Sequence, residues 1–288
     1  MISPVYEEEL GFHTRRCEKG NSDPCPRFHN SFELYFQLEG ERRYILGDGT
    51  ELFLTPTSAL LLRPAVTHSY ISPPEQPYRT AVVGFRRERI TDLVTLSTDT
   101  ILDRPVAAQL FRVPTRMGLE FAADMERVWN KTDAKYRELM IAARLAETIC
   151  ELSLIEPIEL SGQVRDICEE RVVVEVLDFI EKNLSRKLTI AEAAGNTGYT
   201  PNGLSALLRR YTGCTWREQV SQRRCMTALR MLARPDGADI WEIAEQCGFT
   251  SENYFGDFLR ERIGISPREY RRRFQGAVRW NEIPPLFH

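Results

Sequence analysis

The stretch that decides the fold is TIAEAAGNTGYT at residues 189–200, which recurs fifty positions later as DIWEIAEQCGFT at residues 239–250. Each copy starts with a residue that can cap a helix, Thr189 or Asp239, and has a glutamate three positions further on that can bond back to the cap. Each copy then reaches a glycine that can take the left-handed conformation in which helices end. The repeat therefore predicts a short helix and a glycine turn, twice over.

A second helix is predicted after each glycine turn. Thr200 and Thr250 can each cap this helix, and apolar residues then recur at i, i+3 and i+4 in both copies. Glycines at 213 and 264 end the two helices. The apolar positions are Leu204, Leu207, Leu208, Phe255, Phe258 and Leu259. Both copies are thus expected to be helix-turn-helix units.

A long helix joins the two units. It starts at a capping box in residues 215–218, whose counterpart lies in residues 266–269, and it is expected to run to about residue 234, before Pro235 and Gly237. Such a helix is about 30 Å long at 1.5 Å per residue, and major-groove entries on one face of B-DNA lie about 34 Å apart. The spacing predicts that this half of the chain binds double-stranded DNA at two consecutive turns.

Arginines are placed where they can reach phosphates. They close the second helix of each unit and the last helix of the chain, although a solvated charged face is the alternative interpretation. These residues are Arg209, Arg210, Arg260, Arg262, Arg271, Arg272 and Arg273. The charge balance points the same way, because residues 161–288 carry a net charge of +2 and residues 1–160 a net charge of −5.

Residues 172–274 resemble the DNA-binding domain of the AraC/XylS family of transcription regulators. The resemblance is carried by Ile243-Ala244, Gly248-Phe249-Thr250, Tyr254-Phe255, Gly264, Ser266-Pro267 and Tyr270-Arg271. It implies activation of transcription through RNA polymerase, a homodimer, and base recognition by the exposed faces of the two second helices. The candidate DNA-binding residues are Thr200, Asn202, Ser205, Ala206, Arg209, Arg210, Ser251, Glu252, Asn253, Gly256, Asp257 and Arg260. Many relatives have an arginine or glutamine where Ala206 and Asp257 stand, which predicts sparse direct readout.

The N-terminal half is predicted to be a β-barrel or jelly roll, so the fold class is α+β. Strands are expected at residues 32–38, 43–46, 51–54, 59–62 and 81–85, with turn residues about every ten positions. His29, Glu33, the Gly40 turn, and Arg63-Pro64 leading to His68 resemble the cupin-like sensing domain that commonly precedes this DNA-binding domain. We expect a sensing domain at residues 1–115, a helical segment at 116–157, a linker at 158–171, the DNA-binding domain at 172–275 and a tail at 276–288.

A polar pocket is predicted inside the barrel. His29, Glu33, Tyr35 and Gln37 share parity, so an unbulged strand would point them to one side. The candidate ligand-binding residues are Arg27, His29, Glu33, Tyr35, Gln37 and His68. A small polar effector is the favoured occupant, and the family resemblance most often implies a sugar. Two histidines and a glutamate could instead hold a divalent metal, as in cupin enzymes, but metal-binding cupins usually have a further histidine where Arg27 stands, so we predict no metal, no cofactor and no catalytic residue.

The helical segment is predicted to contain helices at residues 118–131 and 134–155. In the second, Ile141, Leu145, Ile149, Leu152 and Ile155 form a continuous apolar stripe, which either packs on the chain's own barrel or forms a dimer seam. A short linker would let ligand-driven movement of the barrel change the placement of the DNA-binding domain.

Composition leaves the class of protein open between a regulator and an enzyme. Hydrophobic residues at 42% and charged residues at 27% are ordinary for a globular protein. No targeting or membrane-spanning segment is evident, so we expect a cytoplasmic protein without membrane contact. The favoured function is a ligand-controlled transcription regulator; the alternatives are a regulator controlled by a partner protein with an empty barrel, and a metal-dependent cupin enzyme with a DNA-binding tail.

Overall fold

The computed structural model describes residues 10–18, 22–90, 100–131, 133–158, 160, 166–234 and 237–275. The chain divides between Glu170 and Arg171 into an N-terminal unit and a C-terminal unit. The expected tail at residues 276–288 and most of the expected linker lie outside the described residues.

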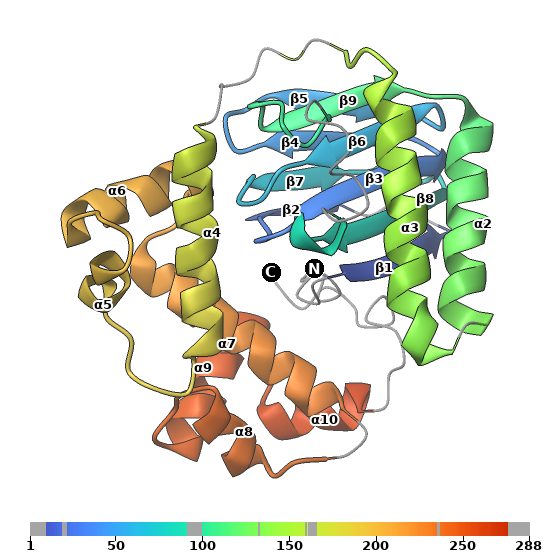
Figure 1. Cartoon of the computed structure of the whole chain (residues 1–288). Helices are drawn as coiled ribbons and strands as arrows, with labels where there is room; N and C mark the ends of the chain where they lie inside the picture. Colours follow the sequence, from blue (N-terminus) through green and yellow to red (C-terminus); the bar gives the residue numbers. More distant parts are fainter. Residues whose placement is uncertain are drawn as a thin grey trace. The chain divides into compact units, whose positions relative to one another are not determined.

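Two antiparallel sheets form the N-terminal unit (Figure 1). The strands are β1 (Leu10–Cys17), β2 (Ser22–Arg27), β3 (Phe32–Glu39), β4 (Arg42–Leu46), β5 (Glu51–Leu54), β6 (Ser58–Leu62), β7 (His68–Ile71), β8 (Tyr78–Phe85) and β9 (Ala108–Arg112). One sheet has the order β1-β8-β3-β6-β9 and the other the order β2-β7-β4-β5. These orders are those of an eight-stranded jelly roll with β9 added at one edge.

The five expected strands are present, but four others were missed from the sequence. β2 shows why, because its Pro24 and Pro26 argue against a strand by composition. β2 lies at the edge of its sheet, where a proline does not interrupt a ladder on both sides.

Alternate residues of β3 face two different cores. Leu34 and Phe36 face a core shared with helices α2 (Thr115–Lys131) and α3 (Ala134–Ser153), whereas Tyr35 faces the other core with residues of both sheets. The two helices cover the outer face of the five-stranded sheet (Figure 1). The parity expected for this strand is confirmed, and the odd-numbered side chains point between the sheets.

The apolar stripe of α3 packs on the chain's own core. Ile141, Leu145, Ile149 and Leu152 are fully buried there, and Ile155 is partly buried against it. The packing interpretation of this stripe is therefore confirmed, and the same side chains are not exposed for a second subunit.

In the C-terminal unit, the described residues form seven helices: α4 (Ile167–Lys182, whose first turn belongs to the N-terminal unit), α5 (Ile190–Gly195), α6 (Pro201–Thr212), α7 (Trp216–Ala233), α8 (Ile240–Gln246), α9 (Glu252–Ile263) and α10 (Pro267–Phe274). α6 and α8 both contact α7 (Figure 1), and α9 reaches the first half of α7 through Arg262, which donates to Ser221. With 18 residues, α7 is about 27 Å long. Two helix-turn-helix units joined by a long helix are thus present, as expected.

The glycine turns have the backbone that the sequence predicted. Gly198 and Gly248 have φ of 72° and 75°, and Gly213 and Gly264 have φ of 72° and 74°. All four lie in the left-handed region that favours glycine.

Two helix starts differ from the expectation. Ser251, and not Thr250, caps α9: its hydroxyl oxygen accepts from the Tyr254 N–H at 3.4 Å. The second turn is therefore one residue longer than the first, which shifts the repeat from fifty to fifty-one positions. At α10 the capping box is incomplete, because the Glu269 carboxylate accepts from Arg272 and Arg273.

Among the described residues, no helix is both long enough and apolar enough to cross a membrane.

Candidate functional site

The exposed face of α6 carries the residues predicted for the first recognition helix. The Thr200 hydroxyl accepts from the Gly203 N–H at 3.1 Å, which fixes the start of the helix. Asn202, Ala206 and Arg209 are exposed on the following turns, Ser205 is half-buried and Arg210 is exposed. The opposite side carries the buried leucines, so the amphipathic pattern decides which face is left for DNA.

The corresponding face of α9 is partly closed by its own ion pairs. Arg260 donates to Asp257 at 2.6 Å, and Glu252 accepts from Arg268 at 3.2 Å. Asn253 is exposed. Gly256, which was expected on the exposed face, is buried: a Cβ there would lie 3.7 Å from the Arg260 guanidinium, which covers this position.

Several arginines expected at phosphates have partners within the C-terminal unit. Arg262 donates to the Ser221 hydroxyl and packs over the Phe258 ring, and Arg271 donates to the Ala238 carbonyl. Arg272 and Arg273 both bind Glu269 and hold the pKa of that half-buried carboxyl low, at about 2. Arg209 makes no ion pair in the described part of the chain. The pKa of Glu218 is lowered mainly by its hydrogen bonds with Thr215, and the charge of Arg209 adds to this effect.

Tyr254 is an exposed aromatic residue that the predicted DNA contacts omit. It lies in the first turn of α9, its side chain is 63% exposed, and one edge packs on the Phe249 ring at a centroid distance of 5.8 Å. The sequence could have identified Tyr254 as a candidate DNA contact, because it follows Asn253 near the start of the second recognition helix.

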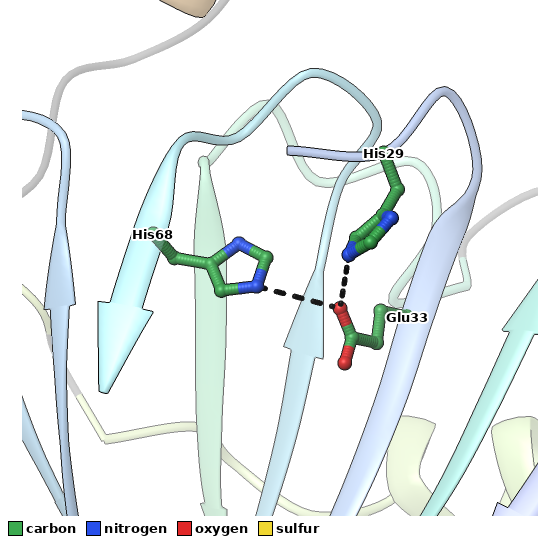
Figure 2. Close-up of side chains that lie close together, drawn as sticks. All are labelled: His29, Glu33 and His68. Atoms are coloured by element: carbon green, nitrogen blue, oxygen red, sulfur yellow. Dashed lines mark ion pairs between the residues drawn. The ribbon is translucent and has the colours of Figure 1, made fainter. Parts of the chain in front are cut away.

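Three of the predicted ligand-binding residues meet at one end of the jelly roll (Figure 2). His29 Nε2 lies 3.6 Å and His68 Nε2 lies 3.7 Å from the same oxygen of Glu33, Oε2. One ligand atom from each side chain lies within 4.8 Å of the other two, so the group could hold a metal ion. His29 precedes β3 and is not on the strand, contrary to the simple parity argument, while Glu33 is on β3 and His68 starts β7.

The loop before β7 holds this cluster in place. His68 Nδ1 lies 3.0 Å from the Val66 carbonyl oxygen, which can only accept, so Nδ1 carries a proton and Nε2 is the ring nitrogen that faces Glu33. Ala65 N donates to the His29 carbonyl at 2.7 Å. Ala65 also has φ of 58°, a left-handed backbone that costs a non-glycine residue free energy and is concentrated at functional sites.

Tyr35 and Gln37 belong to a different polar network. The Tyr35 hydroxyl donates to Gln37 Oε1 at 2.8 Å and accepts from Arg42 Nη1 at 3.2 Å. Arg42 is only 4% exposed, donates through Nε to Ser72 Oγ at 3.0 Å, and lies over the Tyr70 and Tyr78 rings. Burial raises the pKa of Tyr35 to about 12, so its hydroxyl stays protonated as a donor.

Sequence reasoning missed Arg42. On β4, Arg42 alternates in step with Tyr44 and Leu46, whose side chains point inward. This alternation could have predicted that the Arg42 guanidinium also points inward. Arg27, which was predicted at the pocket, ends β2 in register with His68, and its side chain lies outside the described set.

Comparison with known proteins agrees with this arrangement of two units. Residues 193–273 match a family model described as a helix-turn-helix domain, and residues 22–147 match one described as an AraC-like ligand binding domain.

Relatives match over part of this chain. The chain is 33% identical over 101 residues to the uncharacterized HTH-type transcriptional regulator YpdC of Escherichia coli strain K12, covering 35% of each protein. It is 29% identical over 103 residues to the HTH-type transcriptional activator AarP of Providencia stuartii, covering 36% of this chain and 76% of that protein. The chain therefore spans about a third of the length of YpdC and most of the length of AarP.

The solved structure of an apo variant of ToxT from Vibrio cholerae strain SCE256 has a similar fold. Its TM-score is 0.64 at 15% identity, over 93% of this chain and 98% of that chain. ToxT from the same strain with an unsaturated fatty acid bound has a TM-score of 0.62 at 14% identity, over 94% and 98%.

The probable transcription factor PqrA of Proteus vulgaris is 30% identical over 104 residues, and the alignment covers 35% of this chain and 84% of PqrA. Together with the two matching domain models, this shows that the chain belongs to the AraC family of transcription regulators.

Proposed function

We propose that this protein binds a specific double-stranded DNA operator through α6 and α9 and regulates transcription in response to an effector bound by its jelly roll. The observation that carries the proposal is that α6 and α9 are each the second helix of a helix-turn-helix unit, each keeps an exposed face, and α7 separates them. Recognition helices of this kind read base edges in the major groove.

The two units would contact consecutive major-groove segments. Asn202 and Asn253 occupy matching exposed positions and offer the paired donor and acceptor that suit adenine, and Ser205 would also face the bases. Thr200, Arg209 and Arg210 would contact phosphates. Ala206 has no polar group to offer, and Asp257 would accept from a cytosine amine or stay bonded to Arg260. We therefore expect the protein to recognise specific bases at only a few positions in each half-site.

Selection of bound duplexes from a random pool by the full chain tests the proposal. We expect enriched sites with two conserved segments about 10 base pairs apart, one for each unit. A pool that shows no enrichment, or a single short segment only, would contradict it.

The effector is proposed to be a small molecule with a carboxylate. Arg42 is buried, and in the described part of the chain no carboxylate lies within ion-pair distance of it. A buried guanidinium is stabilised by an anionic partner. A fatty acid, as in the ToxT structure, carries such a group, whereas a neutral sugar does not.

Thermal unfolding with added ligands tests this proposal. We expect carboxylates, but not sugars, to raise the unfolding temperature, and we expect Arg42→Met to lose this effect. Stabilisation by sugars alone would contradict the proposal.

Regulation is proposed to pass through the end of β6. Arg63 follows this strand, and its Nε and Nη2 donate to the Glu170 carboxylate at 2.9 to 3.1 Å, while Nη1 donates to the Leu102 and Arg104 carbonyls. Glu170 is in the first turn of α4 and is buried. A change in the loop after Arg63, which also carries Ala65 and leads to His68, would therefore be felt at the start of α4.

A homodimer is proposed to form through the outer face of α3. Tyr136 is 52% exposed, Leu139 60% and Leu154 90%, and Ala143 and Cys150 are exposed between them at helical spacing. A second copy of this apolar row would cover it, as pairing helices do. Sedimentation should show a dimer that Leu139→Glu dissociates; a monomeric wild-type chain at micromolar concentration would contradict the proposal.

We propose that the protein activates transcription through RNA polymerase, as AarP is a transcriptional activator. No enzymatic step is part of the proposal, and the proposed location is the cytoplasm. A promoter fused to the selected operator should give more transcript when the chain and its effector are present.

A further inference from the structure

We propose that His29, Glu33 and His68 bind one divalent transition-metal ion, in contrast to the preference from sequence for a metal-free pocket. This site is independent of DNA binding and of Arg42. Its three side chains come from the loop before β3, from β3 and from the start of β7, and they point toward one another (Figure 2).

The distances fit a shared ion better than direct hydrogen bonds. Hydrogen bonds to a carboxylate are about 2.7–3.2 Å long, and the two Nε2 atoms lie 3.6 and 3.7 Å from Glu33 Oε2. Two ligands that each bind zinc at about 2.0–2.1 Å in tetrahedral geometry lie about 3.4 Å apart. The two histidine–glutamate separations are therefore within a few tenths of an ångström of that spacing, and all three ligand atoms lie within 4.8 Å of one another.

The hydrogen bond at Nδ1 of His68 suits a metal ligand. Because Nδ1 donates to the Val66 carbonyl, the neutral imidazole has its lone pair on Nε2, which is the atom that faces the Glu33 carboxylate. A lone pair and a negative oxygen that face each other in a buried site attract a cation between them. Metal-bound histidines commonly donate their other ring N–H to a carbonyl in the same way.

The surroundings hold the ligands before an ion arrives. His68 and Glu33 are 2% and 6% exposed, and the Tyr44 ring stacks on the His68 ring at 5.8 Å. The Ala65 N–H fixes the backbone of His29 from a residue with left-handed φ. Two imidazoles and one carboxylate suit zinc, iron(II), cobalt or nickel, and leave a coordination position open for water or an effector.

Titration of chelator-treated full chain with Zn²⁺ and Co²⁺ tests the site. We expect one ion per chain, with visible Co²⁺ absorption bands typical of nitrogen and oxygen ligands, and a loss of affinity of about 100-fold or more in Glu33→Gln and in His68→Gln. His13→Ala, on β1, and Glu51→Gln, on β5, are matched controls that should bind as the wild type does. Circular dichroism identifies any variant that fails to fold.

Absence of stoichiometric binding in the wild-type chain would overturn the proposal, as would folded ligand variants that bind as tightly as the controls. Neither result touches the DNA-binding proposal, because operator selection by the metal-free chain reports that function separately.

Discussion

The two helix-turn-helix units have the same helices and glycine turns but different surroundings. At Gly198 an added Cβ would meet no atom within 4 Å, whereas at Gly248 it would lie 2.2 Å from the Leu184 carbonyl oxygen. On the recognition helices, Arg209 has no ion pair among the described residues, whereas Arg260 is bonded to Asp257. The comparison teaches that a repeated sequence pattern repeats the local backbone, while packing and charge are set separately in each copy.

The largest expected difference between the units is in stability. Gly198→Ala and Gly248→Ala both place alanine in the left-handed region, which costs about 1–2 kcal/mol, but only Gly248→Ala also forces backbone apart. We expect Gly248→Ala to lose about 3 kcal/mol or more of unfolding free energy. Gly198→Ala should lose only the cost of the left-handed backbone, about 1–2 kcal/mol. Hydrogen exchange of the full chain, read separately for α5–α6 and α8–α9, measures both.

Gly213→Ala and Gly264→Ala are the controls for this prediction, because both glycines are left-handed and open. These two variants should lose similar amounts of stability. Equal losses for Gly198→Ala and Gly248→Ala would mean that the second turn can relax around Leu184.

Sequence preference should separate the units next. Asn202→Ala and Asn253→Ala each remove an exposed amide at the same repeat position, and one base-edge contact is worth about 1–3 kcal/mol of discrimination. Each variant should relax the consensus in only one half-site, as measured by duplex selection. A uniform loss on operator and random DNA would show instead that the asparagine contacts the backbone of the DNA.

The smallest expected effect is in salt dependence. Arg209→Ala should weaken binding to all sequences alike and reduce the slope of log affinity against log salt by about 1. Arg260→Ala should change the slope less, because Asp257 already neutralises Arg260. Asp257→Asn, which releases Arg260, should strengthen binding; fluorescence anisotropy at several salt concentrations measures all three. Identical slopes for both arginine variants would remove this distinction.

The candidate ligand site shows a similar division between local pattern and tertiary contact. The sequence predicted five of the strands and selected His29, Glu33 and His68, because alternation and turn residues are local signals. It did not separate these three from Tyr35 and Gln37, and it missed Arg42, because parity gives a direction but not a partner.

The sequence by itself determined most of the helix starts and ends of the two helix-turn-helix units. Caps such as Thr200 and Thr215 and left-handed glycines such as Gly213 act within a few residues, so neighbours along the chain suffice to place them. Only the tertiary structure decided that Arg42 lies over the Tyr70 and Tyr78 rings and that two histidines converge on one glutamate oxygen. Those outcomes depend on long-range packing, in which strands far apart in the chain become neighbours, and no local preference encodes such distances.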